Sequence, residues 1–274
     1  RDWSSDVCSS DLELAAPLVA EDPLVFEHAI AHAPIVLSDE RVRRDLAADL
    51  VVVIGRTTLS RSTNAYIQGS SRVMVIDPRT ESIDTSRTAD EIHRTIPMIK
   101  NPIEIDQNWH DQWHKYEEVA AASLSVLPDW SEAEVAAVVA EELENDVALF
   151  IASSRPIRDV ESFAVPRSGI DTFANRGLAG IDGNISTAMG IASKRDETYA
   201  VIGDLAFLHD ISALANPTTD TLTIIVVDND GGGIFSTLSQ RGVDGFEDVF
   251  GTPHGLDPAA IANSMGITSK TIGS

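Results

Sequence analysis

The sequence predicts an α/β protein built from two doubly wound parallel-sheet domains. Short runs such as Leu50–Ile54 and Leu222–Val227 are almost entirely apolar and rich in β-branched residues, which is typical of strands covered on both faces. Segments with helical periodicity alternate with these runs along the chain. Polar or glycine-rich loops follow several of the runs, where parallel sheets bind their ligands.

The chain divides into a short atypical start and two expected domains. Residues 1–12, RDWSSDVCSSDL, show no periodicity and join abruptly to a different composition, so we interpret them as foreign or artefactual. Residues 13–125 form the first domain, with strands expected at Leu50–Ile54 and Arg72–Ile76, a turn-rich stretch and a later helix. Residues 126–274 form the second domain. We expect it to be truncated, because a helix begins after Asp257-Pro258 and no closing element follows it.

The second domain shows the clearer alternation of strands and helices. Ser131 and Glu134 have the spacing of a capping box and predict a helix start. The strands that we expect are Val147–Ile151, Tyr199–Ile202 and Leu222–Val227. The helices that we expect are Ile157–Phe163, Asn184–Ser193 and Phe207–Leu214.

Composition excludes several classes of function. A formal net charge of −23 repels nucleic-acid backbones and anionic lipid, so we expect no nucleic-acid partner. The apolar runs are too short for a membrane span, which needs roughly 20 residues. The single cysteine, Cys8, excludes an internal disulfide framework and favours a cytoplasmic location.

Two polar residues at the ends of neighbouring strands form the strongest candidate site. Asp204 follows one expected strand, and Asn229 follows the next strand 25 residues later. A carboxylate, an amide oxygen and the backbone carbonyl at Gly231 would give Mg²⁺ the oxygen ligands that it prefers. The alternative is that Asp204 and Asn229 are ordinary turn formers, which these residue types often are.

Taken together, the motifs resemble those of a known family. Val-Ile-Gly-Asp204, followed 25 residues later by Asp228-Asn229, resembles the signature of thiamine-diphosphate enzymes, with Leu205 and Asp228 departing from its usual Gly and Asn. Three further segments narrow the resemblance to one family of these enzymes. They are Gly203-Asp204-Leu205, the segment 231–235 (Gly-Gly-Gly-Ile-Phe) and the loop 175–183 (Asn-Arg-Gly-Leu-Ala-Gly-Ile-Asp-Gly). They are similar to segments of the 2-succinyl-5-enolpyruvyl-6-hydroxy-3-cyclohexene-1-carboxylate synthases of menaquinone biosynthesis.

The resemblance implies a role for each of several residues. The implied metal ligands are Asp204, Asn229 and the Gly231 carbonyl, holding Mg²⁺ or Mn²⁺. The other residues implied to contact thiamine diphosphate are Ile181, which props the bent cofactor, Leu205, Gly232, Ile234 and Phe235. The residues implied to bind substrate carboxylates are Ser154, Arg158, Arg176 and, in the first domain, Arg61. Arginine suits this task because it grips a carboxylate through two parallel hydrogen bonds. For Arg158 and Arg176 the alternative is a surface or ion-paired arginine.

The resemblance also implies a reaction and an assembly. The synthases decarboxylate 2-oxoglutarate and add the remaining unit to isochorismate by conjugate addition. A glutamate that activates the cofactor would come from an amino-terminal domain of a partner subunit, so we expect a homo-oligomer, such as a homodimer, with shared active sites. The alternatives are a 2-oxo-acid decarboxylase or acetolactate-type synthase and, in a different class, a non-catalytic nucleotide-binding module.

Other signals favour structural roles. His110 and His114 lie four residues apart, a spacing also found in zinc hydrolases, but Asp111 replaces the glutamate of that motif. Trp109 and Trp113 beside them favour a packed amphipathic helix, and His28 and His32 are interpreted in the same way. Gly55 after a buried strand lacks the further glycines of a dinucleotide fingerprint, so the first domain is expected to be Rossmann-like without a nucleotide.

Overall fold

The structure is a computed structural model that describes residues 16–57, 59–79, 84, 87–97, 104–216 and 220–273. Residues 1–12 and Cys8 therefore lie outside the described residues. The chain forms two compact units, Arg1–Val126 and Leu127–Ser274. Among the described residues, no helix has the length and apolar character needed to cross a membrane.

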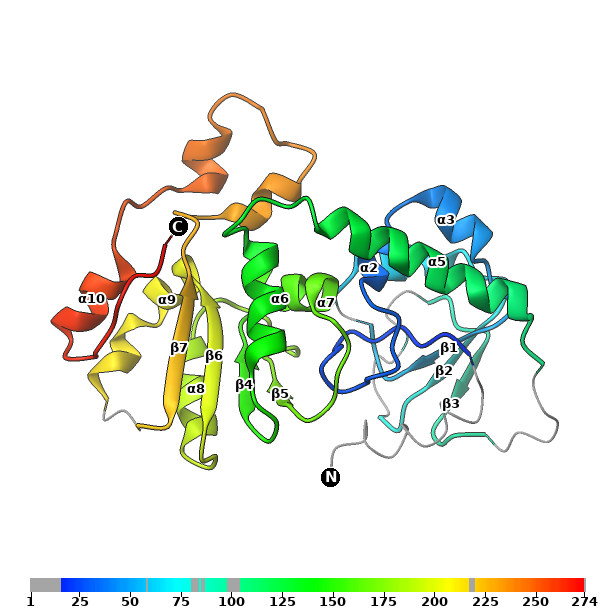
Figure 1. Cartoon of the computed structure of the whole chain (residues 1–274), viewed down its shortest axis with the longest axis horizontal. Coiled ribbons are helices and arrows are strands. Elements are labelled where there is room, and N and C mark those ends of the chain that lie inside the picture. Colours follow the sequence, from blue (N-terminus) through cyan, green and yellow to red (C-terminus); the bar gives the residue numbers. More distant parts are fainter. Residues whose placement is uncertain are drawn as a thin grey trace. The chain divides into compact units, whose positions relative to one another are not determined.

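Unit 1 is a three-stranded parallel sheet with helices (Figure 1). Its strands are β1 (Val51–Ile54), β2 (Val73–Ile76) and β3 (Glu91–His93), in the order β1-β2-β3. Its helices are α2 (Ala33–Val36), α3 (Glu40–Asp45), α4 (Arg61–Gln68) and α5 (Gln107–Leu124). The turn-rich stretch expected around residues 79–101 therefore contains a strand, β3, whose polar Glu and His hid it from the apolar pattern.

Aromatic packing organises the core of unit 1. Trp113 of α5 is almost fully buried and meets Tyr66 edge-to-face, with ring centroids 5.6 Å apart. The Tyr66 hydroxyl donates to the carbonyl of Leu46 at 2.8 Å. The expectation of a packed amphipathic helix around His110 and His114 is confirmed, since α5 spans both residues and buries Trp113 in this core.

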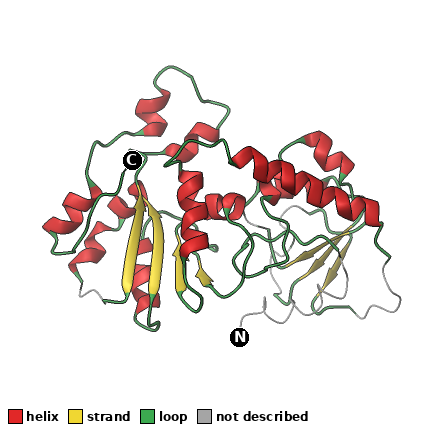
Figure 2. Ribbon diagram, in the orientation of Figure 1, coloured by secondary structure: helices red, strands yellow, loops and turns green. Residues whose placement is uncertain are grey.

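Unit 2 is a four-stranded parallel sheet in the order β5-β4-β6-β7 (Figure 2). Its strands are β4 (Ala148–Ile151), β5 (Asp171–Phe173), β6 (Thr198–Gly203) and β7 (Leu222–Val227). Its helices and helical turns are α6 (Glu132–Glu142), α7 (Arg155–Phe163), α8 (Asn184–Ala192), α9 (Asp204–His209), η1 (Ile211–Ala215), η2 (Gly233–Thr237), η3 (Glu247–Gly251) and α10 (Pro258–Ser264). Both sheets are parallel and carry helical crossovers, so the predicted α/β fold class is confirmed.

Strand order fixes where a ligand would bind. From β4 the chain crosses to β5 on one side, and it then crosses back to β6 on the other side of β4. Right-handed crossovers in opposite directions place α7 and α8 on opposite faces of the sheet. Figure 1 shows α8 behind the strands. The order reverses between β4 and β6, and the carboxyl ends of strands at such a point are the usual binding site of this architecture.

One expected helix is wrong in detail. The segment Phe207–Leu214 is not continuous, because α9 ends at His209 and the 3₁₀ helix η1 follows. Asp210 interrupts it, since its carboxylate accepts hydrogen bonds from the backbone and side chain of Ser186 at 2.8 and 3.2 Å. This tie to α8 holds Asp210 at φ −120°, outside helical geometry.

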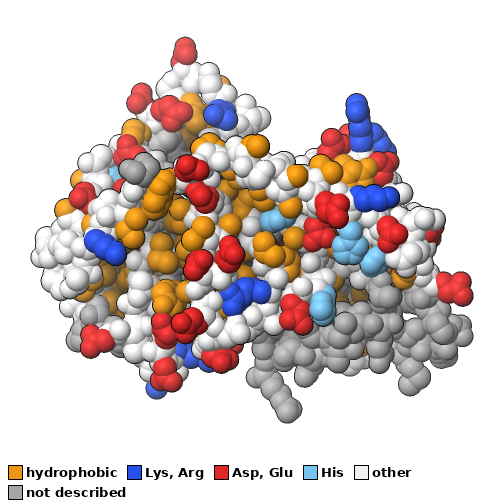
Figure 3. Space-filling model, viewed as in Figure 1, with side chains coloured by type: hydrophobic (Ala, Val, Ile, Leu, Met, Phe, Trp, Pro, Cys, Tyr) orange, Lys and Arg blue, Asp and Glu red, His pale blue; other side chains and the backbone are white. Residues whose placement is uncertain are grey.

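The visible face of the molecule is acidic. Asp and Glu side chains are spread across it, with Lys and Arg scattered between them (Figure 3). This distribution agrees with the net charge of −23, and an anionic ligand would need local cations to bind.

Candidate functional site

A pocket of about 110 Å³ lies at the carboxyl ends of β4, β6 and β7 in unit 2. The residues expected from the sequence that line it are Ser154, Ile181, Asp204, Leu205, Asn229, Gly231, Gly232, Ile234 and Phe235. The fold therefore brings the proposed metal ligands and all of the proposed cofactor contacts to one place, at the point where the strand order reverses.

Asp204 is the buried carboxylate of the polar part of the site. This residue is 2% exposed, and it begins α9 directly after β6. Its carboxylate accepts from the backbone N–H of Leu205 at 2.7 Å and, on the other oxygen, from the N–H of Gly231 at 2.7 Å. Two of the three proposed ligands thus contact each other across neighbouring strand ends.

The loop after β7 turns sharply at Gly231, which has a φ of +139°. A β-carbon at Gly231 would overlap the carbonyl oxygen of Gly251, whose own position is fixed by a hydrogen bond from Gly232 at 2.6 Å. Only glycine fits this close approach of two backbone segments. The glycines therefore bring the backbone of the loop close to the site.

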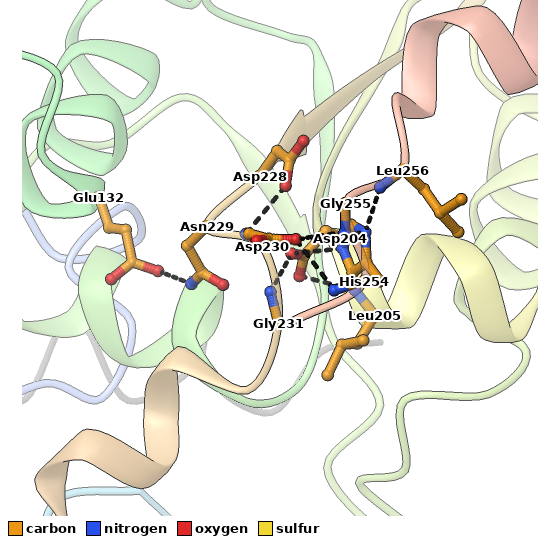
Figure 4. Close-up of polar contacts among 10 residues, drawn as sticks. All are labelled: Glu132, Asp204, Leu205, Asp228, Asn229, Asp230, Gly231, His254, Gly255 and Leu256. Atoms are coloured by element: carbon orange, nitrogen blue, oxygen red, sulfur yellow. Dashed lines mark hydrogen bonds and ion pairs between the residues drawn. The ribbon is translucent and has the colours of Figure 1, made fainter. Parts of the chain in front are cut away.

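A second loop crosses the site. Nε2 of His254 lies 3.1 Å from Asp204, and the carboxylate of Asp230 accepts from the N–H groups of His254 and Gly255 at 3.0 and 2.7 Å (Figure 4). These backbone hydrogen bonds, that of Gly255 first, lower the pKa of Asp230. Among the described residues, Asp204, Asp228 and His254 are placed so that they could hold a metal ion, with one ligand atom from each lying within 4.8 Å of the others.

The residues present fit a hard divalent cation. Asp204 is a buried carboxylate with no arginine or lysine among its described ion pairs, and oxygen atoms of Asn229, Gly231 and Asp228 lie in the adjoining loop. The N–H of Gly231 donates to the carboxylate of Asp204, which brings the backbone of this loop to the proposed metal position. The oxygen-rich donor set is that of Mg²⁺ or Mn²⁺ rather than of a soft metal.

A charged network that the sequence did not reveal lines the same pocket. Nη2 of Arg155 lies 3.1 Å from carboxylate oxygens of both Glu132 and Asp159. Burial raises the pKa of Asp159 to about 7, against the lowering effect of Arg155. The spacing of Arg155 and Asp159, four apart on α7, was readable as a helical ion pair. The link from Arg155 to Glu132 could not be predicted from the sequence, because Glu132 belongs to another helix, α6.

The proposed substrate arginines do not line the pocket. Arg158 and Arg176 are half-buried, each has interaction partners, and neither is among the lining residues in the described part of unit 2. Arg61 is exposed at the start of α4 in unit 1. Ser154 does line the pocket, and its φ of +78° places it in a strained turn between β4 and α7.

Comparisons with known proteins agree with this geometry. Residues 160–274 match the family described as thiamine pyrophosphate enzyme, C-terminal TPP binding domain. Three curated relatives, each named 2-succinyl-5-enolpyruvyl-6-hydroxy-3-cyclohexene-1-carboxylate synthase, come from Thermobifida fusca, Nocardia farcinica and Rhodococcus jostii. Their identities are 40, 37 and 34%, over 80, 85 and 95% of this chain.

The chain spans somewhat less than half the length of these relatives, namely 42, 41 and 49%. The matched segment contains Asp204, Asn229 and the loops around them. The chain thus carries the cofactor-binding domain of the thiamine pyrophosphate enzymes in residues 160–274, and over 80–95% of its length it is similar to the 2-succinyl-5-enolpyruvyl-6-hydroxy-3-cyclohexene-1-carboxylate synthases.

Proposed function

We propose that the protein containing this chain joins 2-oxoglutarate to isochorismate with loss of CO₂, using thiamine diphosphate and Mg²⁺ or Mn²⁺. The observation that carries the proposal is the convergence of Asp204, Asn229 and Gly231 beside the apolar residues Ile181, Ile234 and Phe235 in one pocket. A cofactor with a diphosphate at one end and aromatic rings at the other fits a site that has a polar and an apolar part. When bound, thiamine diphosphate supplies the carbanion chemistry that decarboxylates a 2-oxo acid.

The chain's own residues bind and orient the ligands. Asp204, Asn229 and the carbonyl of Gly231 would hold the cation that neutralises the diphosphate. The apolar residues Ile181, Ile234 and Phe235 would exclude water from the reacting carbon atoms. Ser154, Arg158, Arg176 and Arg61 are proposed to hold the substrate carboxylates, and Leu205 and Gly232 to contact the cofactor.

The same proposal includes the assembly of the protein. We propose a cytoplasmic homo-oligomer whose active site is shared between subunits, as the resemblance to the synthases implies. The glutamate that activates the cofactor is proposed to come from another domain of the assembly.

Product analysis tests this function against its alternatives. The protein is supplied with thiamine diphosphate, Mg²⁺ and 2-oxoglutarate, with or without isochorismate, and with pyruvate as a separate substrate. We expect CO₂ release to require isochorismate and to match the formation of the adduct. Release of a free aldehyde or acetolactate, independent of isochorismate, would indicate another thiamine-diphosphate enzyme. An absence of cofactor binding would indicate a non-catalytic module.

A further inference from the structure

The side chain of Asn229 is held in one orientation by a residue from a different helix. Its amide nitrogen donates a hydrogen bond to Oε1 of Glu132, at the start of α6 and 97 residues away along the chain. Figure 4 shows the amide nitrogen of Asn229 facing Glu132, and its oxygen on the opposite side, toward Gly231 and Asp204. This orientation presents the amide oxygen to the proposed metal position.

An asparagine side chain can ligate a cation only through its oxygen, because the amide nitrogen carries two hydrogens and offers no lone pair for the metal. A carboxylate beside Asn229 favours the orientation in which nitrogen faces it, since the flipped amide would set oxygen against oxygen. We infer that Glu132 is a positioning residue for the metal site, which fixes the amide of Asn229 so that its oxygen faces the cation. The inference rests on the proposed function.

Glu132 is itself held in place. Its second oxygen, Oε2, lies 3.1 Å from Nη2 of Arg155, which in turn lies 3.1 Å from Asp159. Asp159 is only 4% exposed, so this end of the network is anchored in the interior of unit 2. With one oxygen on Asn229 and the other on Arg155, Glu132 acts through Asn229 rather than on the cation directly.

The backbone on the other side of Asn229 is shaped to admit this orientation. A β-carbon at Gly233 would overlap the amide nitrogen of Asn229. Glycine at this position therefore leaves room for the amide group beside Glu132. Asn229 is confined between the turn of its own loop and a charged partner on α6.

The first test measures Mg²⁺ affinity by calorimetric titration in the presence of thiamine diphosphate, using the protein that contains this chain. Residues that orient metal ligands typically contribute about 10- to 100-fold to metal affinity, so Glu132→Ala should weaken Mg²⁺ binding by about that factor. Glu132→Gln keeps an oxygen acceptor for the amide of Asn229 and should bind Mg²⁺ more tightly than Glu132→Ala. Glu142→Ala, which removes an exposed carboxylate from the same helix, should leave the affinity unchanged.

The second test separates positioning from a general structural role. In an Asn229→Asp background both ends of the side chain are oxygen, so there is no amide to orient. Glu132→Ala should then cost no Mg²⁺ affinity and should tighten binding by removing a like charge. An equal loss in both backgrounds would show that Glu132 supports the fold rather than Asn229.

These outcomes are distinct from a failure of the proposed function. If the unaltered protein binds no thiamine diphosphate with Mg²⁺, the function itself is wrong. If it binds both, and Asp204→Ala abolishes binding while Glu132→Ala leaves it unchanged, only the positioning role is wrong. If Glu132→Ala does not fold, Glu132→Gln decides, because a loss greater than tenfold in that variant would contradict the inference.

Discussion

At the scale of single residues, Gly231 makes the site possible through its backbone. Its φ of +139° and its closeness to the carbonyl of Gly251 leave no room for a side chain. Gly231→Ala should lower the free energy of unfolding by about 1–3 kcal/mol, measured by urea denaturation. Gly190→Ala is the matched control, since its β-carbon would meet nothing within 4 Å on helix α8. An unchanged stability in Gly231→Ala would mean that this turn is not constrained as described.

Asp159 should make the stability of the folded protein depend on pH. Burial raises its pKa to about 7 in the folded state, above its value in the unfolded chain. The folded state therefore holds the Asp159 proton more tightly than the unfolded chain does. The protonated carboxyl contributes its full stabilisation below about pH 4, and this contribution is lost as the pH rises to about 7. Since each unit of difference in pKa between the folded and unfolded states corresponds to about 1.4 kcal/mol, the loss in unfolding free energy is at most roughly 4 kcal/mol.

Asp159→Asn removes this titration. The unfolding free energy of the variant, minus that of the unaltered protein, should increase when the pH is raised from 4.5 to 8. Urea denaturation of both proteins at both pH values measures this difference. Asp171→Asn, at an exposed position in β5, is the control and should show no such change. A stability difference that stays constant across this range would show that Asp159 does not titrate there.

At the scale of elements, helix α6 carries Glu132 and begins at a capped terminus. Ser131 accepts a hydrogen bond from the N–H of Glu134 at 3.2 Å, and Glu134 returns a bond to the N–H of Trp130. The capping box expected from the sequence thus forms, with its return bond shifted by one residue. Its role is to fix the first turn of α6, where Glu132 lies.

Removal of this cap should be measurable. Ser131→Ala should lower the free energy of unfolding by about 1 kcal/mol, because the first turn of α6 loses a hydrogen-bond acceptor. Ser193→Ala, at the exposed end of α8, should have a smaller effect. Equal effects of the two substitutions would show that the cap on α6 has no special role.

The elements also show what could be predicted from sequence. The strand Leu222–Val227 was predicted with its observed bounds, because its apolar run ends at polar residues on both sides. The short edge strand β5 (Asp171–Phe173) was missed, since three residues show no periodicity. Asp204, Asn229 and Gly231 could be proposed as metal ligands from the sequence because a motif places them in the loops that follow two strands. The pairing of Asn229 with Glu132 depends on tertiary packing, which no local pattern encodes.

At the scale of the whole molecule, a net charge of −23 opposes the binding of anions. Proposed dicarboxylate substrates therefore need specific cationic partners. Replacing Arg158 or Arg176 by alanine should lower kcat/KM for 2-oxoglutarate or isochorismate roughly 10- to 150-fold, through loss of a charged hydrogen bond of about 1.5–3 kcal/mol. Thiamine-diphosphate affinity should stay nearly constant. If both variants keep normal kinetics for both acids, these arginines do not bind substrate.

The proposed function depends on the proposed metal site, and the role of Asp204 in that site can be measured directly. The measurement is a calorimetric titration of the protein with thiamine diphosphate, with Mg²⁺ and with a chelator in its place, for the unaltered protein, Asp204→Ala and Asn229→Ala. We expect binding that requires Mg²⁺, is abolished by loss of the anionic ligand in Asp204→Ala and is weakened less by loss of the neutral ligand in Asn229→Ala. Thiamine-diphosphate binding that is equally tight without Mg²⁺ or in Asp204→Ala would contradict the assignment.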